Sequence, residues 1–393
     1  MKLKGILLIS LAFCLPISIF VTDVLVFALI LLWLVERNFS VKWQKIKGSK
    51  WMLSIVVLFT VYLFGMQWGT NHSNGSWILQ KSAILLLLPI LYSFDFSDKQ
   101  IKHSLYAFVF SMTLSSVVAL LINLKWIKHL FKYSDIFTKS WNNPAFMPYT
   151  DHNVFLAFTI LLCFIYVLYS SKDKRQFLPI ILVVIVCTLS LFTEKGRAGQ
   201  IAFLIGATIF LTISFWNKKM RGFISLLSIV SIVLLSYNFS STFNQRIKSS
   251  LAHSQQLDEE STNSLNTRYY LFKYALDKVK ERPIMGFGTG SFVKEFSSIS
   301  EHASKILEED LHKTPHNNYL FILFELGLIG LLSFISIFYF QIREVYKKPL
   351  GKIRIIMPIM FLVIMMFDTY FQNHNSAILY VYLSLAFNYY SFK

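Results

Sequence analysis

The segment from Thr314 to Leu320 combines a helix-start signal with a histidine. Thr314 is a good N-cap residue and Pro315 fits the first helical position, so an apolar helix is expected to begin here. His316 then lies in its first turn, where the positive end of the helix dipole disfavours an imidazolium. A neutral histidine in that place can act as a general base near pH 7. A capping or interfacial histidine explains the same pattern equally well.

A carboxylate lies inside the apolar run that follows. Glu325 comes nine residues after His316, which corresponds to about 13 Å along a helix. A carboxylate at that depth in a membrane is costly and is usually functional or paired. We expect Glu325 to orient a basic partner, and Lys81 is the candidate for that partner or for a phosphate contact. Gly327 and Gly330 are expected to permit close helix packing.

Arginines in two separate segments could hold a phosphate. Arg197 stands between Gly196 and Gly199 at the start of another apolar run. Its planar guanidinium can bind a phosphate through two parallel hydrogen bonds. An interfacial arginine that reaches toward the headgroups is the alternative explanation. Further along the chain, Arg268 is the main candidate, on an amphipathic helix whose polar face could equally be only solvated; Arg246 and Arg282 are close to it in sequence.

The glycine-rich stretch from Gly286 to Phe292 superficially resembles a phosphate-binding loop. No strand is expected before it, so the dinucleotide-binding context is missing. We therefore interpret the stretch as a tight turn between two helices.

The composition identifies the elements that must carry these groups. Hydrophobic residues make up 55% of the 393 residues, charged residues only 15%, and the mean hydropathy is +0.53. A soluble chain of this size cannot hide so much apolar surface in one core, so the excess must face lipid. The sequence predicts an all-α, polytopic membrane protein with about twelve membrane helices, at residues 5–20, 21–36, 51–69, 78–94, 104–124, 153–170, 177–193, 198–216, 222–239, 317–341, 353–371 and 375–390.

The net charge of +17 follows the expected topology. With the N-terminus inside, the inner segments hold 21 Lys and Arg against 5 Asp and Glu. This positive-inside bias accounts for nearly the whole charge, which leaves little for a nucleic-acid partner to explain. We expect an uncleaved first hairpin, with Asp23 at its turn, and both termini in the cytoplasm.

One outer connection is long and amphipathic. Residues 240–315 carry ten basic and ten acidic residues, with apolar residues at helical spacing in 265–279 and 292–306. The sequence thus divides into helices one to nine (1–239), a folded helical outer loop (240–315) and helices ten to twelve (316–393). The three cysteines lie in apolar runs and no Cys/His spacing suggests a metal site. His152 and His374 are interpreted as structural.

These motifs together resemble the O-antigen ligase and polymerase superfamily. The resemblance covers essentially the whole chain and is carried by His316-Asn317-Asn318 with Glu325, by Arg268 with the Gly286–Phe292 turn, and by Arg197. It implies a GT-C-like, metal-independent, inverting glycosyltransferase without a cofactor in a bacterial inner membrane, with its active site on the periplasmic side. The donor would be a glycan on undecaprenyl diphosphate. His316 would be the catalytic base, Arg197 and Arg268 would bind the diphosphate, and Glu325, Lys81, Asn317 and Arg246 could support them.

The resemblance leaves the acceptor open. A ligase would use a sugar hydroxyl of the lipid A-core, whereas a polymerase would extend another lipid-linked repeat. The single large outer loop favours the ligase, because polymerases often carry a second substantial loop with arginine. A transporter or flippase for a lipid-linked glycan is an alternative of another class. It is disfavoured because the chain shows no internal repeat and its polar groups gather at the outer face.

Overall fold

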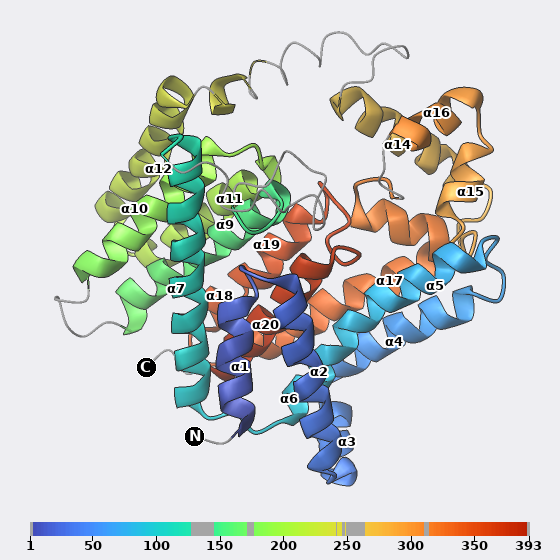
Figure 1. Ribbon diagram of the computed structural model, residues 1–393, viewed down its shortest axis with the longest axis horizontal. Helices are drawn as coiled ribbons and strands as arrows, with labels where there is room; N and C mark the ends of the chain where they lie inside the picture. The colour runs from blue at the N-terminus through green and yellow to red at the C-terminus, as the bar shows by residue number, and fades with distance from the viewer. Residues whose placement is uncertain are drawn as a thin grey trace.

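The described part of the chain is entirely helical in the computed structural model (Figure 1). The structure describes residues 3–126, 145–170, 177–240, 242–245, 248, 264–309 and 314–390. No strand occurs within these ranges. The all-α membrane fold predicted from composition is therefore confirmed.

Helices occupy every apolar run in which a membrane helix was expected. Six of the described helices are long and apolar enough to cross a membrane, and the pair α2 and α3, bent by 114°, would make a seventh. Several others are shorter, so the count of twelve stays a prediction. The helices before the outer loop are α1 (Leu3–Cys14), α2 (Ile19–Val35), α3 (Phe39–Gly48), α4 (Lys50–Gly65), α5 (His72–Ala83), α6 (Leu87–Ser93), α7 (Asp98–Asn123), α9 (Tyr149–Ile165), α10 (Phe177–Thr193), α11 (Arg197–Phe215) and α12 (Lys219–Phe239).

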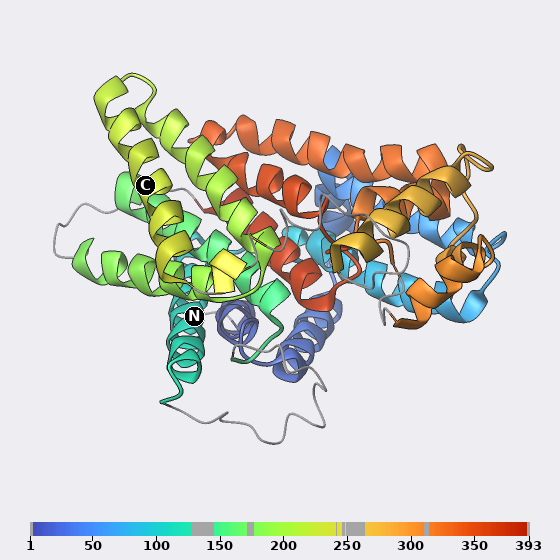
Figure 2. The ribbon, with the colours of Figure 1, turned by 90° about the horizontal axis from the view of Figure 1, so that it is seen from above.

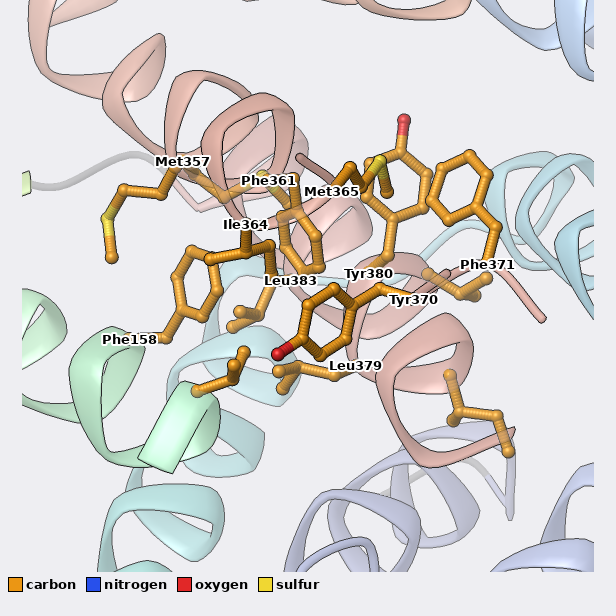
Figure 3. Packing of buried hydrophobic residues seen from close by; sticks show 14 of the residues in the cluster. Phe158, Met357, Phe361, Ile364, Met365, Tyr370, Phe371, Leu379, Tyr380 and Leu383 are labelled. Carbon is orange, nitrogen blue, oxygen red and sulfur yellow. The ribbon is translucent and has the colours of Figure 1, made fainter. Parts of the chain in front are cut away.

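The helices after the loop are α17 (Asn318–Tyr346), α18 (Gly351–Arg354), α19 (Ile356–Ile364) and α20 (His374–Tyr389). Of these, α20 is buried along nearly its whole length, as is α9 from the first half of the chain. Helices that are apolar on all sides favour such central positions. Aromatic side chains fill the space between α9, α19 and α20, where Phe158 stacks on Phe361 at 4.6 Å and Phe361 meets Tyr380 edge to face (Figure 3).

Peripheral helices present apolar side chains outward. Along α12, Phe223 is 65% exposed and Leu227 54%. A water-facing surface would not tolerate such a continuous apolar helix, so this face is suited to lipid. Figure 2 shows α10 and α12 at one edge of the helical body.

Three helices are described within residues 240–315, namely α14 (Ser264–Val279), α15 (Phe292–Ser297) and α16 (Glu301–Glu309). Helix α15 and the turn before it lie beside α4 and the start of α5, whereas α14 packs on α17 (Figure 1). The first expected amphipathic helix is present as α14, but the second is divided into α15 and α16. Ser298 donates back to the Glu295 carbonyl, and Ser300 caps the next helix by accepting from Ala303 N–H. Such serine bonds compete with continuous helix, which explains the break.

Candidate active site at the start of helix α17

Helix α17 begins three residues later than the sequence pattern predicts. Its N-cap is Asn317, whose side-chain oxygen accepts from Leu320 N–H at 3.0 Å. The expectation that Thr314 is the cap and Pro315 the first helical residue is wrong. Asparagine is an equally strong cap, and Thr314 is used instead in a hydroxyl contact of 2.8 Å with Thr369. His316 therefore lies just before the cap and not in the first turn.

His316 adopts a left-handed backbone conformation, with φ of +50°. For a residue with a side chain this costs about 1–2 kcal/mol and is found at positions that the surroundings determine strongly. The side chain is largely buried, and its Nδ1 lies 3.1 Å from Oδ1 of Asp368. A proton on Nδ1 shared with this carboxylate fixes the ring orientation and leaves the basic lone pair of the neutral imidazole on Nε2.

Asp368 lies outside the helices, in the loop from Met365 to Asn373 between α19 and α20. Burial alone would raise the pKa of this carboxyl. The hydrogen bond from His316, the charges of His316 and Arg268, and the backbone N–H of Thr369 outweigh burial and hold the pKa of Asp368 below its ordinary value. The group is thus ionised near neutral pH, as a partner that orients a histidine must be.

The same loop binds Arg268. Its guanidinium donates to the carbonyl of Phe367 at 3.2 Å, directly beside Asp368. The structure therefore brings together two of the predicted site residues, Arg268 from the first turn of α14 and His316 from the approach to α17. Asn317 also reaches this loop, donating from Nδ2 to the carbonyl of Met366 at 3.2 Å.

Arg197 lies on another helix, α11. It is the first residue of α11, and the segment before it is held by Asn153, which donates to the Gly196 carbonyl at 2.9 Å. Helix α11 packs against α19, with Gly206 close to Met360. Because α19 leads directly into the Met365–Asn373 loop, the packing of α11 on α19 links the Arg197 helix with the loop that binds His316.

Glu325 receives its hydrogen bonds from the glycine-rich turn. The N–H of Gly290 lies 3.1 Å from both carboxylate oxygens, and the N–H of Phe292 lies 3.3 Å from Oε1. Backbone amides from one turn that converge in this way form an anion-binding concavity, and here the anion is the protein's own carboxylate. The interpretation of this stretch as a tight turn is consistent with its geometry.

The turn also explains the glycines of α17. Gly327 has φ of +62° and interrupts the helix, and the N–H groups of Leu328 and Ile329 pair with the carbonyls of Pro283 and Ile284. A Cβ on Gly327 would lie 2.3 Å from the Ile284 backbone. The expectation that Gly327 permits helix–helix packing is wrong, since it accommodates a turn. The nearest atoms to Gly330 likewise belong to its own helix.

The remaining predicted residues occupy other surroundings. Lys81, in the last turn of α5, has its Nζ 6.0 Å from the Trp77 ring centroid and interacts electrostatically with His374. Glu325 is oriented by backbone amides, so the expectation of a lysine partner does not match its described hydrogen bonds. Arg282 stacks over Phe287. Arg246 lies outside the described residues.

Sequence reasoning missed Asp368, because the residue was placed inside an expected span at 353–371. The signal that could have found it is a lone carboxylate within an apolar run, which is functional or paired more often than not. His152 was interpreted as structural, and it is fully buried between Glu194 and Ser115.

The fold and these groups define a multi-pass helical membrane protein with a histidine–aspartate pair and an arginine beside the start of α17. Residues 182–335 match the model of the family described as "O-Antigen ligase". The chain thus carries an O-antigen ligase family domain, and the resemblance drawn from the motifs is confirmed. The matched residues include Arg197, Arg268, His316 and Glu325, whereas Asp368 lies beyond them.

Relatives of the chain are distant. A Haemophilus influenzae protein described as "Uncharacterized protein" is 25% identical over 72% of this chain and 71% of its own length. Proteins named "Putative polysaccharide ligase" are 27% identical in Rickettsia conorii and 28% in Rickettsia bellii. These two matches cover 48% and 44% of this chain, and only 44% and 41% of the relatives. The chain therefore spans less than half the length of the Rickettsia proteins.

Proposed function

We propose that the protein is an O-antigen ligase that transfers a glycan from undecaprenyl diphosphate to a sugar hydroxyl of the lipid A-core. The observation that carries the proposal is the convergence of Arg268 and His316 on the adjacent residues Phe367 and Asp368. An arginine and an oriented histidine side by side are the two groups that such a transfer needs. The matched family domain supports the same activity.

In the proposed reaction, Nε2 of His316 takes the proton of the acceptor hydroxyl. The hydroxyl oxygen forms a bond to the anomeric carbon of the donor, and the bond from that carbon to the diphosphate oxygen breaks. The proton stays on His316, where Asp368 stabilises the imidazolium. Arg268 and Arg197 stabilise the negative charge on the departing diphosphate, which is worth most in a poorly hydrated site. A single displacement inverts the anomeric centre, and no metal or other cofactor takes part.

The proposed topology has about twelve spans in a bacterial inner membrane. Both termini lie in the cytoplasm, and α14, α15 and α16 lie in the periplasm. The charge distribution supports this orientation. The donor's isoprenoid chain would enter from the bilayer while its diphosphate reaches the arginines at the outer face.

Purified protein with both lipid-linked substrates tests the proposal. We expect a glycosidic bond to lipid A-core with release of undecaprenyl diphosphate. Joining of two lipid-linked repeats without use of the core would identify a polymerase, and movement of donor across a vesicle without any new bond would identify a flippase. In a deletion strain, a ligase leaves core-only surface lipid, whereas a polymerase leaves core bearing one repeat.

A further inference from the structure

The first turn of α9 contains three consecutive polar residues in an otherwise apolar helix. Asp151, His152 and Asn153 are 1%, 0% and 0% exposed. Burying such groups is costly unless each is hydrogen-bonded. Because consecutive helix residues point about 100° apart, the three side chains reach different neighbours.

His152 and Asn153 hold the segment that leads to Arg197. Nδ1 of His152 lies 2.9 Å from Glu194 Oε1, and its Nε2 lies 2.9 Å from the Ser115 hydroxyl. Asn153 donates to the Gly196 carbonyl, and Gly199 lies against the Asn153 backbone so closely that a Cβ would stand 2.2 Å from its carbonyl carbon. Both sides of Arg197 are therefore fixed against α9.

Asp151 faces the opposite half of the site. Its carboxylate accepts from the Ser376 hydroxyl at 2.7 Å and from Asn375 Nδ2 at 3.1 Å. Both partners are in the first turn of α20, which directly follows the Met365–Asn373 loop. That loop is the one that binds His316 through Asp368 and Arg268 through Phe367.

We propose that Asp151, His152 and Asn153 are positioning residues that set the distance between Arg197 and the His316–Asp368–Arg268 cluster. One helical turn binds the Arg197 segment on one side and the start of α20 on the other, so a displacement of this turn shifts the two halves relative to each other. This inference rests on the proposed function for the roles of Arg197 and His316. Misplacement of a catalytic group by about 1 Å can cost about 10²-fold in rate.

Another buried polar cluster in the same core provides a matched control. Gln341 of α17 donates to the Ser384 hydroxyl at 3.0 Å and accepts from Tyr380 at 2.8 Å. Like Asp151, it is buried and reaches α20, but it joins none of the predicted site residues. Ser384→Ala should therefore affect stability without moving the two halves of the site.

The kinetic test compares Asp151→Asn and His152→Gln with Ser384→Ala. We expect each of the first two to lower transfer by about 10- to 100-fold at a thermal stability matching the control. In an Arg197→Ala background the same two changes should cost much less, because misplacement of an absent side chain has no effect. If the losses add to that of Arg197→Ala, or if Ser384→Ala loses as much transfer at equal stability, the positioning role is refuted.

A second measurement does not depend on activity. Spin labels at Lys195→Cys and Lys273→Cys, both on exposed residues, report the distance between the two halves when Cys14 is replaced with serine. We expect one narrow distance in the otherwise native protein and in Ser384→Ala, and a broadened or shifted one in Asp151→Asn. An unchanged distance in Asp151→Asn would overturn the proposal. If the wild-type protein shows no transfer but Asp151→Asn still shifts the distance, the positioning role of the α9 turn stands and the proposed function is rejected.

Discussion

His316 and Asp368 are 52 residues apart in sequence, yet Nδ1 of the histidine lies 3.1 Å from Oδ1 of the aspartate. The pair joins the approach to α17 with the loop between α19 and α20. It makes a largely buried histidine in a strained conformation an oriented base with a defined basic nitrogen. The pair is therefore the first target for mutation.

Replacement of His316 should abolish most transfer while leaving the fold intact. Loss of a positioned base typically costs about 10²–10⁴-fold in rate. His316→Gln, which can hydrogen-bond but takes no proton at neutral pH, should be nearly as inactive as His316→Ala, and donor binding should survive in both. Asp368→Asn should lie between these variants and the wild type, with a loss of at least about tenfold. A His316→Gln protein that keeps half the wild-type rate would show that the histidine only positions the acceptor.

Replacement of Arg197 or Arg268 with lysine should abolish most transfer. If Arg197 and Arg268 hold a diphosphate, Arg→Lys loses the planar fork and should fail nearly as badly as Arg→Ala, by about 10²-fold or more. Expression and membrane insertion, followed by immunoblot of the membrane fraction, should be normal. Near-normal transfer by both lysine variants would mean that only general positive charge is needed.

Acid should remove the contribution of Asp368 to stability. Its pKa is lower in the folded protein than in the unfolded chain, so the folded state binds fewer protons at this site. The stabilisation is fully present above the unfolded pKa of about 3.9 and is lost as the pH falls through the folded pKa. The apparent Tm of Asp368→Asn should thus approach that of the wild type as the pH falls below about 4. A Tm difference that widens as the pH falls below about 4 contradicts the assignment.

Gly327→Ala should destabilise the protein although it replaces one small residue with another. The left-handed backbone and the contact with Ile284 both oppose a Cβ, at about 1–3 kcal/mol. Gly48→Ala, at the end of α3, is the matched control, since no atom lies within 4 Å of the added carbon. Thermal denaturation in detergent should separate the two, and equal apparent Tm values would show that the break in α17 is not required.

The positive-inside bias predicts the orientation of the chain. A reporter fused near Asn263 should be active only in the periplasm, and one fused near Lys347 only in the cytoplasm. Paired phosphatase and fluorescent fusions at each position check the result. A cytoplasmic signal at Asn263 would place the candidate site on the wrong side of the membrane for the proposed reaction.

The helices could be predicted from sequence because each one depends on its own apolar run. The boundaries of α17 could not, since Thr314 and Asn317 are both good caps and a tertiary contact with Thr369 decides between them. Motif resemblance identified His316 and Arg268, but their meeting place at Phe367 and Asp368 depends on a loop more than 50 residues away in sequence. No local pattern encodes that contact.

The position of Glu325 in the chain has a consequence for biogenesis. The amides of Gly290 and Phe292 that bind it come 35 and 33 residues earlier, so the ribosome synthesises this turn before it synthesises Glu325. A helix with an unsatisfied carboxylate partitions poorly into lipid. Insertion of α17 into the membrane is therefore coupled to docking of the preceding turn. The two segments should fold together as one cooperative hairpin. Substitutions in the turn should then impair insertion of α17 and expose the protein to quality-control proteases, although the turn itself is not a membrane span.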